Sequence, residues 1–286
     1  DFFVQYNYNI RNGITSKKPL VLCLNGPAGT GKTTVTEVAA EAMNMHYKKI
    51  SLAGASGKAS IKGYESVYTG SNMGGVAEGQ IEGGTRRVLY CLDEVEKSAS
   101  SNYNGKVEDT LLALFDDQAK FTDDNLNVPI DISQSIFILT TNEFEKLSNP
   151  LKNRVRKIEI KPYGVDIKSQ IAKLKMTNEL KKNKLDSIVN IKPEAYNAIA
   201  EMTQDQGGRE TTRNVDTLIK KIVDMVALNE NDGKTIDVTS AFVKKELGPV
   251  SEKTSIKERI LKSAEKAAQQ VVQEAQNAQT ETAKAQ

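Results

Sequence analysis

The chain has few of the residues that build metal and disulfide sites. It contains one histidine, two cysteines and no tryptophan in 286 residues. Two cysteines cannot form a disulfide scaffold. One histidine excludes a His-based metal site, and together with two cysteines it gives too few ligands for a closed structural zinc site.

A strong charge of one sign and a long apolar segment are also absent. Lys and Arg number 39 and Asp and Glu 37, so the formal net charge is +2. This near-balance argues against a strongly basic nucleic-acid coat and an acidic disordered tail, although it is compatible with a local basic channel. No apolar run approaches the roughly 20 residues that cross a bilayer, and no signal-like stretch opens the chain. We therefore expect no membrane segment, and a location in the cytoplasm or, in a eukaryote, an organelle matrix.

Short apolar segments alternate with helix-forming stretches in the first half of the chain. Residues 20–25, 87–92 and 135–140 each have the apolar run of a buried strand, and residues 32–44 are rich in helix formers. This alternation predicts a parallel sheet with crossover helices, in an α/β domain over residues 1–163. Residues 53–84 are dense in glycine and lack apolar periodicity, so we expect them to be loop-rich.

The pattern changes after a Pro-Tyr-Gly turn that ends at Gly164. Helical or extended patterns follow at residues 166–184, 193–202, 209–228 and 235–238, and again from Ser240. These patterns predict a small helical domain over residues 164–248. Residues 249–286 are rich in Ala and Gln and predict a long helix or tail. A coiled-coil contact is the second interpretation, which an Ala-rich seam disfavours.

A phosphate-binding loop is the clearest motif. Residues 26–33 have the sequence GPAGTGKT, which matches G-x-x-x-x-G-K-[ST] at every fixed position, between a strand and a helix. The glycines let backbone N–H groups surround phosphate oxygens, and the helix directs its positive end at the same charge. We expect Lys32 to reach the β- and γ-phosphates and the Thr33 hydroxyl to ligate Mg²⁺. The nucleotide-binding residues are then Gly26, Pro27, Ala28, Gly29, Thr30, Gly31, Lys32, Thr33 and Thr34.

Polar residues follow the second and third predicted strands. Asp93 and Glu94 end the second, where an acid beside a phosphate loop holds Mg²⁺. We assign Asp93 to that role, through a water, and Glu94 to activation of the attacking water; a solvated acidic loop is the alternative. Asn142 follows the third strand and is a candidate for holding this water, although Asn is common in such turns. The chain contains no Asn-Lys-x-Asp motif, which argues against a guanine-specific GTPase.

Together these motifs resemble the AAA+ ATPases, and most closely the ATPase module of the Lon proteases. The similarity covers roughly residues 18–248. Besides the phosphate loop it includes segments 50–54, 61–63, 68–70, 92–97, 111–116, 150–155, 207–209, 236–239 and 247–248. The resemblance implies a P-loop α/β domain with a parallel sheet, followed by a helical lid. In that fold a strand separates the strands of Cys23 and Cys91, which we expect to be buried and unbonded.

The resemblance also implies roles for residues of the nucleotide site. Asn142 would be the sensor-1 residue, and Arg154 would reach the γ-phosphate bound by a neighbouring subunit. Arg209 would contact the nucleotide from the small domain. Plainer alternatives are a surface charge for Arg154, with Arg156 as the other candidate, and a helix cap or ion pair for Arg209.

A second set of residues would handle a substrate. Tyr68 and Thr69 would line a central pore and grip an extended polypeptide, because an aromatic ring gives large contact area with little demand on sequence. Tyr103 would lie in a second pore loop. Both tyrosines could instead pack within their own loops, and Thr69 stands where the family usually has an apolar residue.

The resemblance implies an ATP-hydrolysing motor with ATP and Mg²⁺ as cofactors. It would form a homo-oligomer, a hexameric ring or spiral, that unfolds polypeptide or translocates it through a central pore. The Ser–Lys peptidase domain of the Lon family does not follow the small domain, so we expect ATPase activity without peptidase activity from this chain, and a separate peptidase or adaptor as a partner. A nucleic-acid remodeller or loader is one alternative, with little support from a net charge of +2. An ATP-bound scaffold is another, disfavoured by the set Glu94, Asn142 and Arg154.

Overall fold

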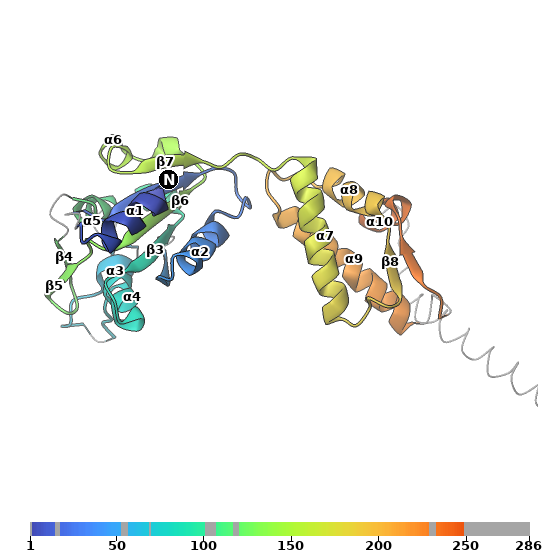
Figure 1. Ribbon diagram of the computed structural model, residues 1–286, viewed down its shortest axis with the longest axis horizontal. Coiled ribbons are helices and arrows are strands. Elements are labelled where there is room, and N and C mark those ends of the chain that lie inside the picture. The colour runs from blue at the N-terminus through green and yellow to red at the C-terminus, as the bar shows by residue number, and fades with distance from the viewer. Residues whose placement is uncertain are drawn as a thin grey trace, which may run out of the picture. The chain divides into compact units, whose positions relative to one another are not determined.

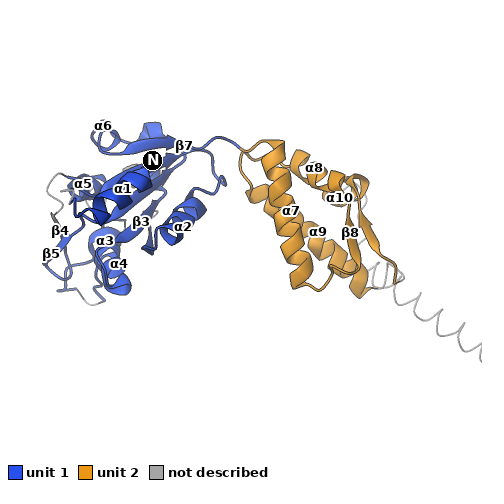
Figure 2. Ribbon diagram, viewed as in Figure 1, with its two compact units in different colours: residues 1–162 blue, residues 163–286 orange. Residues whose placement is uncertain are grey.

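The computed structural model describes residues 2–14, 18–52, 57–68, 70–100, 107–116, 120–228 and 233–248, with the side chains of 98–100 and 120 excepted. Thr69, Tyr103 and the predicted helix at 249–286 lie outside this part. The chain divides into two compact units, Asp1–Pro162 and Tyr163–Gln286 (Figure 2). The division falls one residue before the boundary expected from the sequence.

A five-stranded parallel sheet forms the centre of the first unit (Figure 1). Its strand order is β2-β3-β6-β1-β7. The strands are β1 (Leu20–Asn25), β2 (His46–Ser51), β3 (Val88–Asp93), β6 (Ile136–Thr141) and β7 (Arg156–Glu159). The three strands predicted from apolar runs are thus confirmed to within a residue. The expectation for the cysteines is also confirmed, because β6 lies between β1 and β3 and both thiols are free and buried.

Helices cover both faces of this sheet. Alternate residues of β1 show the two faces: Val21 and Cys23 belong to one core cluster, and Leu22 and Leu24 to another. The helices of this unit are α1 (Phe2–Arg11), α2 (Lys32–Ala42), α3 (Gly57–Lys62), α4 (Gly75–Gly83), α5 (Val107–Leu114) and α6 (Asn149–Lys152), with the 3₁₀ turns η1 (Val95–Ser100) and η2 (Phe144–Lys146). An antiparallel hairpin, β4 (Lys120–Asp123) and β5 (Val128–Asp131), precedes β6.

The prediction of a loop-rich segment at residues 53–84 was wrong for α3 and α4. Three glycines of α4 lie four residues apart, on one side of the helix. A Cβ at Gly75 would lie 2.8 Å from Ile50, at Gly79 2.7 Å from the Tyr90 ring, and at Gly83 2.7 Å from His46. The glycines therefore let α4 pack against β2 and β3 at a distance where an added Cβ would force neighbouring atoms to move.

The second unit is mainly helical. It contains α7 (Val165–Lys182), β8 (Val189–Ile191), α8 (Pro193–Glu201), α9 (Arg209–Ala227), β9 (Ile236–Val238) and α10 (Ser240–Leu247). The sequence predicted the extended piece that is β9, but not its parallel partner β8. Thr239 caps α10 by accepting a hydrogen bond from the backbone N–H of Phe242 at 3.2 Å. No helix within the described ranges is both long and apolar enough to cross a bilayer.

Candidate nucleotide site

The phosphate-binding loop connects β1 to α2 at the carboxyl edge of the sheet. Gly29 and Gly31 have φ angles of 81° and 71°, the left-handed region that favours glycine. Gly31 precedes α2 without a side-chain cap, so the first N–H groups of this helix are available to an anion. A Cβ at Gly26 would collide with the backbone carbonyl of Ile160. The glycines of the motif thus serve both the curl of the loop and its packing against the chain that follows β7.

Lys32 begins α2, and its side chain turns back across the loop. Its Nζ donates to the carbonyls of Gly26 and Pro27, at 2.7 and 2.9 Å, and to Oδ1 of Asn142 at 2.8 Å. The Nδ2 of Asn142 donates in turn to Oε1 of Glu96 at 2.9 Å. A continuous hydrogen-bonded chain therefore links the phosphate loop, the end of β6 and η1.

Thr33 and Asp93 meet at the same edge. The Thr33 hydroxyl donates to Oδ1 of Asp93 at 3.1 Å, and the Thr140 hydroxyl donates to the same oxygen at 2.5 Å. Lys49 lies 2.7 Å from Oδ2. Burial by itself raises the pKa of Asp93, but the hydrogen bonds from Lys49 and Thr140 outweigh burial and leave this pKa below its usual value. Asp93 is therefore a carboxylate at neutral pH, the form that binds a cation.

Glu94 has a backbone conformation unusual for a residue with a side chain. Its φ angle is 60°, and its N–H donates to the Thr140 hydroxyl at 3.2 Å. The carboxylate is part-exposed and accepts from Lys97 Nζ at 2.6 Å. A strained residue directly after Asp93 is consistent with a functional position.

The residues at this edge fit Mg²⁺ bound together with a nucleotide. Thr33 and Asp93 offer a hydroxyl and a carboxylate, and Mg²⁺ prefers oxygen ligands and usually binds through few protein groups plus phosphates and water. No group of three or more His, Cys, Asp or Glu side chains in the described part of the chain could hold a metal by itself. A metal here would thus depend on phosphate oxygens to complete its shell.

Arg154 lies at a different place on the first unit. It follows α6, is exposed, and donates from one guanidinium nitrogen to the Pro150 carbonyl at 3.2 Å. It lines a groove of about 450 Å³ with Leu20 and Gln134, which lie at the amino ends of β1 and β6. The structure therefore does not bring Arg154 to the phosphate loop of its own chain. Arg156, the other candidate, packs its guanidinium over the Phe2 ring at 5.0 Å.

Tyr68 lies in a loop between α3 and α4 whose base is closed. Gly63 and Met73 form an antiparallel bridge, and the Tyr64 N–H donates to the Asn72 carbonyl at 3.0 Å. The side chains of Val67 and Tyr68 are 79% and 64% exposed. An ordered base thus presents an exposed aromatic and an exposed aliphatic side chain.

Arg209 begins α9 in the second unit, after a tightly hydrogen-bonded loop. The backbone N–H of Glu210 donates to Oδ2 of Asp205 at 3.0 Å, and Oε2 of Glu210 accepts from the N–H groups of Gln204 and Asp205 at 2.7 and 2.8 Å. These reciprocal bonds join the loop to the first turn of the helix, which has Gly208 as its N-cap residue. Lys168, almost fully buried, donates to the carbonyls of Thr203 and Asp205.

Sequence reasoning missed three residues of the site: Lys49, Glu96 and Thr140. Lys49 and Thr140 lie near the carboxyl ends of β2 and β6, beside Asp93 in the sheet. Glu96 lies just beyond the Asp93-Glu94 pair. All three residues could have been identified by their position near the carboxyl ends of predicted parallel strands, where ligand sites form.

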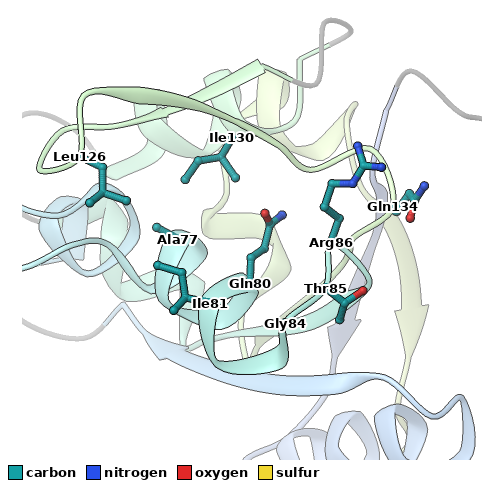
Figure 3. Close-up of a pocket in the computed structure, with 9 residues that line it drawn as sticks. All are labelled: Ala77, Gln80, Ile81, Gly84, Thr85, Arg86, Leu126, Ile130 and Gln134. Carbon is teal, nitrogen blue, oxygen red and sulfur yellow. The ribbon is translucent and has the colours of Figure 1, made fainter.

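A second hollow, of about 530 Å³, lies at the amino edge of the sheet under the β4–β5 hairpin (Figure 3). Leu126 and Ile130 line it from the hairpin, and Ala77 and Ile81 line it from α4. Arg86 at its rim forms an ion pair with Asp131. It is therefore separate from the phosphate loop at the carboxyl edge.

The fold and the site together define a P-loop nucleoside triphosphatase: a parallel sheet with a glycine loop, a lysine, a threonine and an aspartate at its carboxyl edge. Residues 22–163 match the family described as "ATPase family associated with various cellular activities (AAA)". Through these residues the chain belongs to the AAA ATPases, which use ATP, generally with Mg²⁺.

The resemblance to the Lon proteases extends beyond that match. The chain is 33% identical over 239 residues to the Lon protease of Clostridium acetobutylicum, covering 82% of this chain. It is 32% identical over 256 residues, 82% of this chain, to the peroxisomal Lon protease homolog 2 of Kluyveromyces lactis. It is 30% identical over 217 residues, 74% of this chain, to the mitochondrial Lon protease homolog of Caenorhabditis elegans.

The matched region is the ATPase portion of these larger proteins. The aligned part covers 30% of the Clostridium protein, 25% of the Kluyveromyces protein and 22% of the Caenorhabditis protein. The chain is thus an AAA ATPase related to the ATPase module of Lon proteases.

Proposed function

We propose that this chain is an ATP-driven motor module that assembles into a ring and pulls polypeptide through a central pore. The single observation that supports it most is the meeting of four groups at one edge of the sheet as two hydrogen-bonded pairs, Lys32 with Asn142 and Thr33 with Asp93. This is the arrangement that hydrolysis of a nucleoside triphosphate requires.

Each group at the edge has a distinct task in this proposal. Lys32 exchanges carbonyl partners for phosphate oxygens and offsets the charge that develops there. Thr33 and Asp93 would hold Mg²⁺, which would supply further neutralisation of phosphate charge. Glu94 accepts a proton from the attacking water, and Asn142 orients that water.

Residues away from this edge complete the cycle. Arg154 is exposed on the amino side of the sheet, so we assign it to the phosphate of a neighbouring subunit. We propose that Arg209 reaches from the second unit to contact the nucleotide, because the hydrogen bond between Asp205 and the Glu210 N–H fixes the start of its helix. Hydrolysis would then depend on assembly, and six subunits is the number that the resemblance to Lon proteases implies.

The polypeptide grip is assigned to the loop of Tyr68. Val67 and Tyr68 are exposed on a loop with a closed base. A polypeptide that moves through a pore presents a changing sequence to this loop. Apolar and aromatic side chains suit such a substrate, because they give contact area with little demand on sequence. Thr69 is proposed to act with Tyr68, and Tyr103 is proposed as a residue of a second pore loop. A separate peptidase or adaptor would act on what the pore delivers.

Complementation between two inactive variants tests the assignment in trans. Lys32→Met subunits lack the phosphate contact and keep Arg154. Arg154→Ala subunits lack this arginine and keep Lys32. Each variant alone is expected to be inactive. In an equal, randomly assembled mixture, about a quarter of the interfaces combine an intact Lys32 with an intact Arg154, and these are expected to regain activity. Arg156→Ala is the matched control and is expected to remain active alone. No recovery on mixing, with Arg154→Ala inactive, would contradict action in trans.

Translocation has its own test. Tyr68→Ala is expected to keep ATP turnover and to lose ATP-driven unfolding of a tagged fluorescent protein. Tyr8→Ala is the matched control, because Tyr8 is 58% exposed on α1. Unchanged unfolding by Tyr68→Ala would remove this residue from the proposal.

A further inference from the structure

We propose that Glu96 is a positioning residue that fixes the orientation of the Asn142 amide, so that its oxygen, and not its NH₂ group, faces Lys32 and the phosphate loop. This inference rests on the proposed function, because it concerns how Asn142 acts in hydrolysis. Glu96 itself touches neither the nucleotide nor water in this proposal.

The hydrogen bonds around Asn142 define the orientation. Both its Nδ2 and its backbone N–H donate to Oε1 of Glu96, at 2.9 and 3.3 Å. Lys32 Nζ donates to Oδ1 at 2.8 Å. A carboxylate only accepts hydrogen bonds and an ammonium only donates them. The reverse orientation would therefore place an amide NH₂ against an ammonium and two oxygen atoms against each other.

The backbone brings Glu96 to this place by an unusual route. Glu94 has a φ of 60°, which turns the chain sharply at the end of β3, and the 3₁₀ turn η1 follows from Val95. The Lys97 N–H donates to the Glu94 carbonyl at 3.0 Å and closes the turn. This turn thus places Glu96 beside Asn142, the residue that follows β6.

The burial of Glu96 argues against a purely structural role. The residue is 9% exposed, and its Oε2 has no hydrogen-bond partner within the part of the chain that the structure describes. A buried carboxylate oxygen without a partner lowers stability, so an apolar side chain would serve the core better. Both hydrogen bonds that Oε1 accepts within the described residues come from Asn142, which points to a task at that residue.

The orientation decides what Asn142 can do. An amide oxygen that faces the phosphate loop can accept a hydrogen bond from an attacking water and from Lys32, whereas it cannot donate one to a phosphate oxygen. We therefore assign Asn142 to the water and to Lys32. Loss of Glu96 would free the amide to rotate, and turnover would fall while nucleotide binding changed little.

The kinetic test uses the full chain and a double-mutant cycle. Glu96→Ala is expected to lower kcat about tenfold and to change KM for ATP by less than about threefold. Glu96→Gln should recover part of kcat, because its carbonyl can still accept from Asn142. Glu96→Ala combined with Asn142→Ala should be no slower than Asn142→Ala alone. Glu82→Gln, an exposed glutamate on α4, is the control and should match the wild type.

Other results would overturn the inference. Effects of Glu96→Ala and Asn142→Ala that multiply in the double variant would show independent roles. A loss confined to KM, or a melting temperature that falls in step with kcat across Glu96→Ala and Glu96→Gln, would assign Glu96 to stability instead.

A readout without turnover separates this inference from the proposed function. In ¹⁵N-asparagine-labelled protein, the side-chain NH₂ resonances of Asn142, assigned by their loss in Asn142→Asp, are expected to move in Glu96→Gln and to stay unchanged in Glu82→Gln. Unmoved resonances would overturn the inference even in an active enzyme. A wild type without ATP turnover would contradict the proposed function, while moved resonances would still uphold the orientation.

Discussion

Each unit of the molecule contains a buried lysine, and the two lysines have different surroundings. Lys32 in the first unit and Lys168 in the second are 8% and 6% exposed. Both donate to backbone carbonyls. Lys32 lies among the glycines of a loop beside the uncapped start of α2, whereas Lys168 closes the loop that precedes α9 and lies 3.9 Å from a carboxylate oxygen of Asp205.

From this difference we infer that Lys32 is available to a ligand, whereas Lys168 stabilises the fold. An anion at the start of α2 can compete for Lys32, because the helix supplies N–H groups for it. Lys168 donates to two carbonyls of the loop before α9, and its removal would leave the buried Thr203 oxygen and the part-buried Asp205 oxygen without this donor. We therefore predict that the same side chain, at similar burial, contributes to binding in one unit and to stability in the other.

The largest expected effect is the loss of ATP turnover in Lys32→Met. Removal of a charge that stabilises the phosphate in the transition state should lower kcat/KM by about 100-fold or more. Phosphate release and the binding of a fluorescent ATP analogue measure it. Lys146→Met, which removes an exposed lysine of η2, should stay within about twofold of the wild type.

The comparison predicts the opposite pattern for Lys168→Met. This change leaves one buried and one part-buried carbonyl without their donor, so the free energy of unfolding of the second unit should fall by about 2 kcal/mol. Urea unfolding followed by circular dichroism measures it, with Lys173→Met on the exposed side of α7 as the control. If Lys168→Met lost as much ATP binding as Lys32→Met and its unfolding did not change, the assignment of Lys168 to stability would be contradicted.

A smaller effect is expected where α4 packs on the sheet. Gly79→Ala places a Cβ 2.7 Å from the Tyr90 ring and 3.1 Å from the Lys48 Cβ, so the first unit should lose about 1–2 kcal/mol. Gly164→Ala meets nothing within 4 Å and should change stability by less than about 1 kcal/mol. Equal effects in urea unfolding would show that α4 can shift to accept the methyl group.

The smallest effect concerns alkaline pH and the first unit alone, which holds both cysteines. Burial raises the pKa of the Cys23 thiol to about 12 and also raises that of Cys91. For Cys23, between about pH 9 and 12, the folded state keeps a proton that the unfolded state has lost, so stability falls as pH rises, by about 1 kcal/mol at pH 9.5. Cys23→Ala should flatten this dependence in urea unfolding followed through pH.

The thiols also report which unit unfolds. At pH 8 neither should react with a disulfide reagent until the first unit opens. Lys168→Met should leave the urea dependence of thiol reactivity unchanged, and Gly79→Ala should shift it to lower urea. A shift in both variants would show that the units unfold together.

The sequence predicted the site best where spacing along the chain sets the geometry. The phosphate loop needs one turn between a strand and a helix, so Gly26 to Thr33 could be recognised from neighbouring residues alone. Asp93 and Asn142 followed apolar runs that predicted buried strands. The roles of these residues stay predictions, as do those of Arg154 and Arg209.

The sequence predicted less where contacts join distant segments. Glycines 75, 79 and 83 have the spacing of a helical face, but glycine also favours turns, and only the contacts with β2 and β3 distinguish the two. Thr140 and Lys49 come to Asp93 through strand order, which no local pattern specifies.

By itself, the sequence determined the phosphate loop, the main strands and the kinship with AAA ATPases, because these depend on residues close together in the chain. The tertiary structure decided that Glu96 bonds Asn142, that α4 lies against the sheet, and that Lys168 closes the loop before Arg209. These contacts span residues far apart in sequence or depend on a strained turn, and side-chain packing fixes them only once the whole fold has formed.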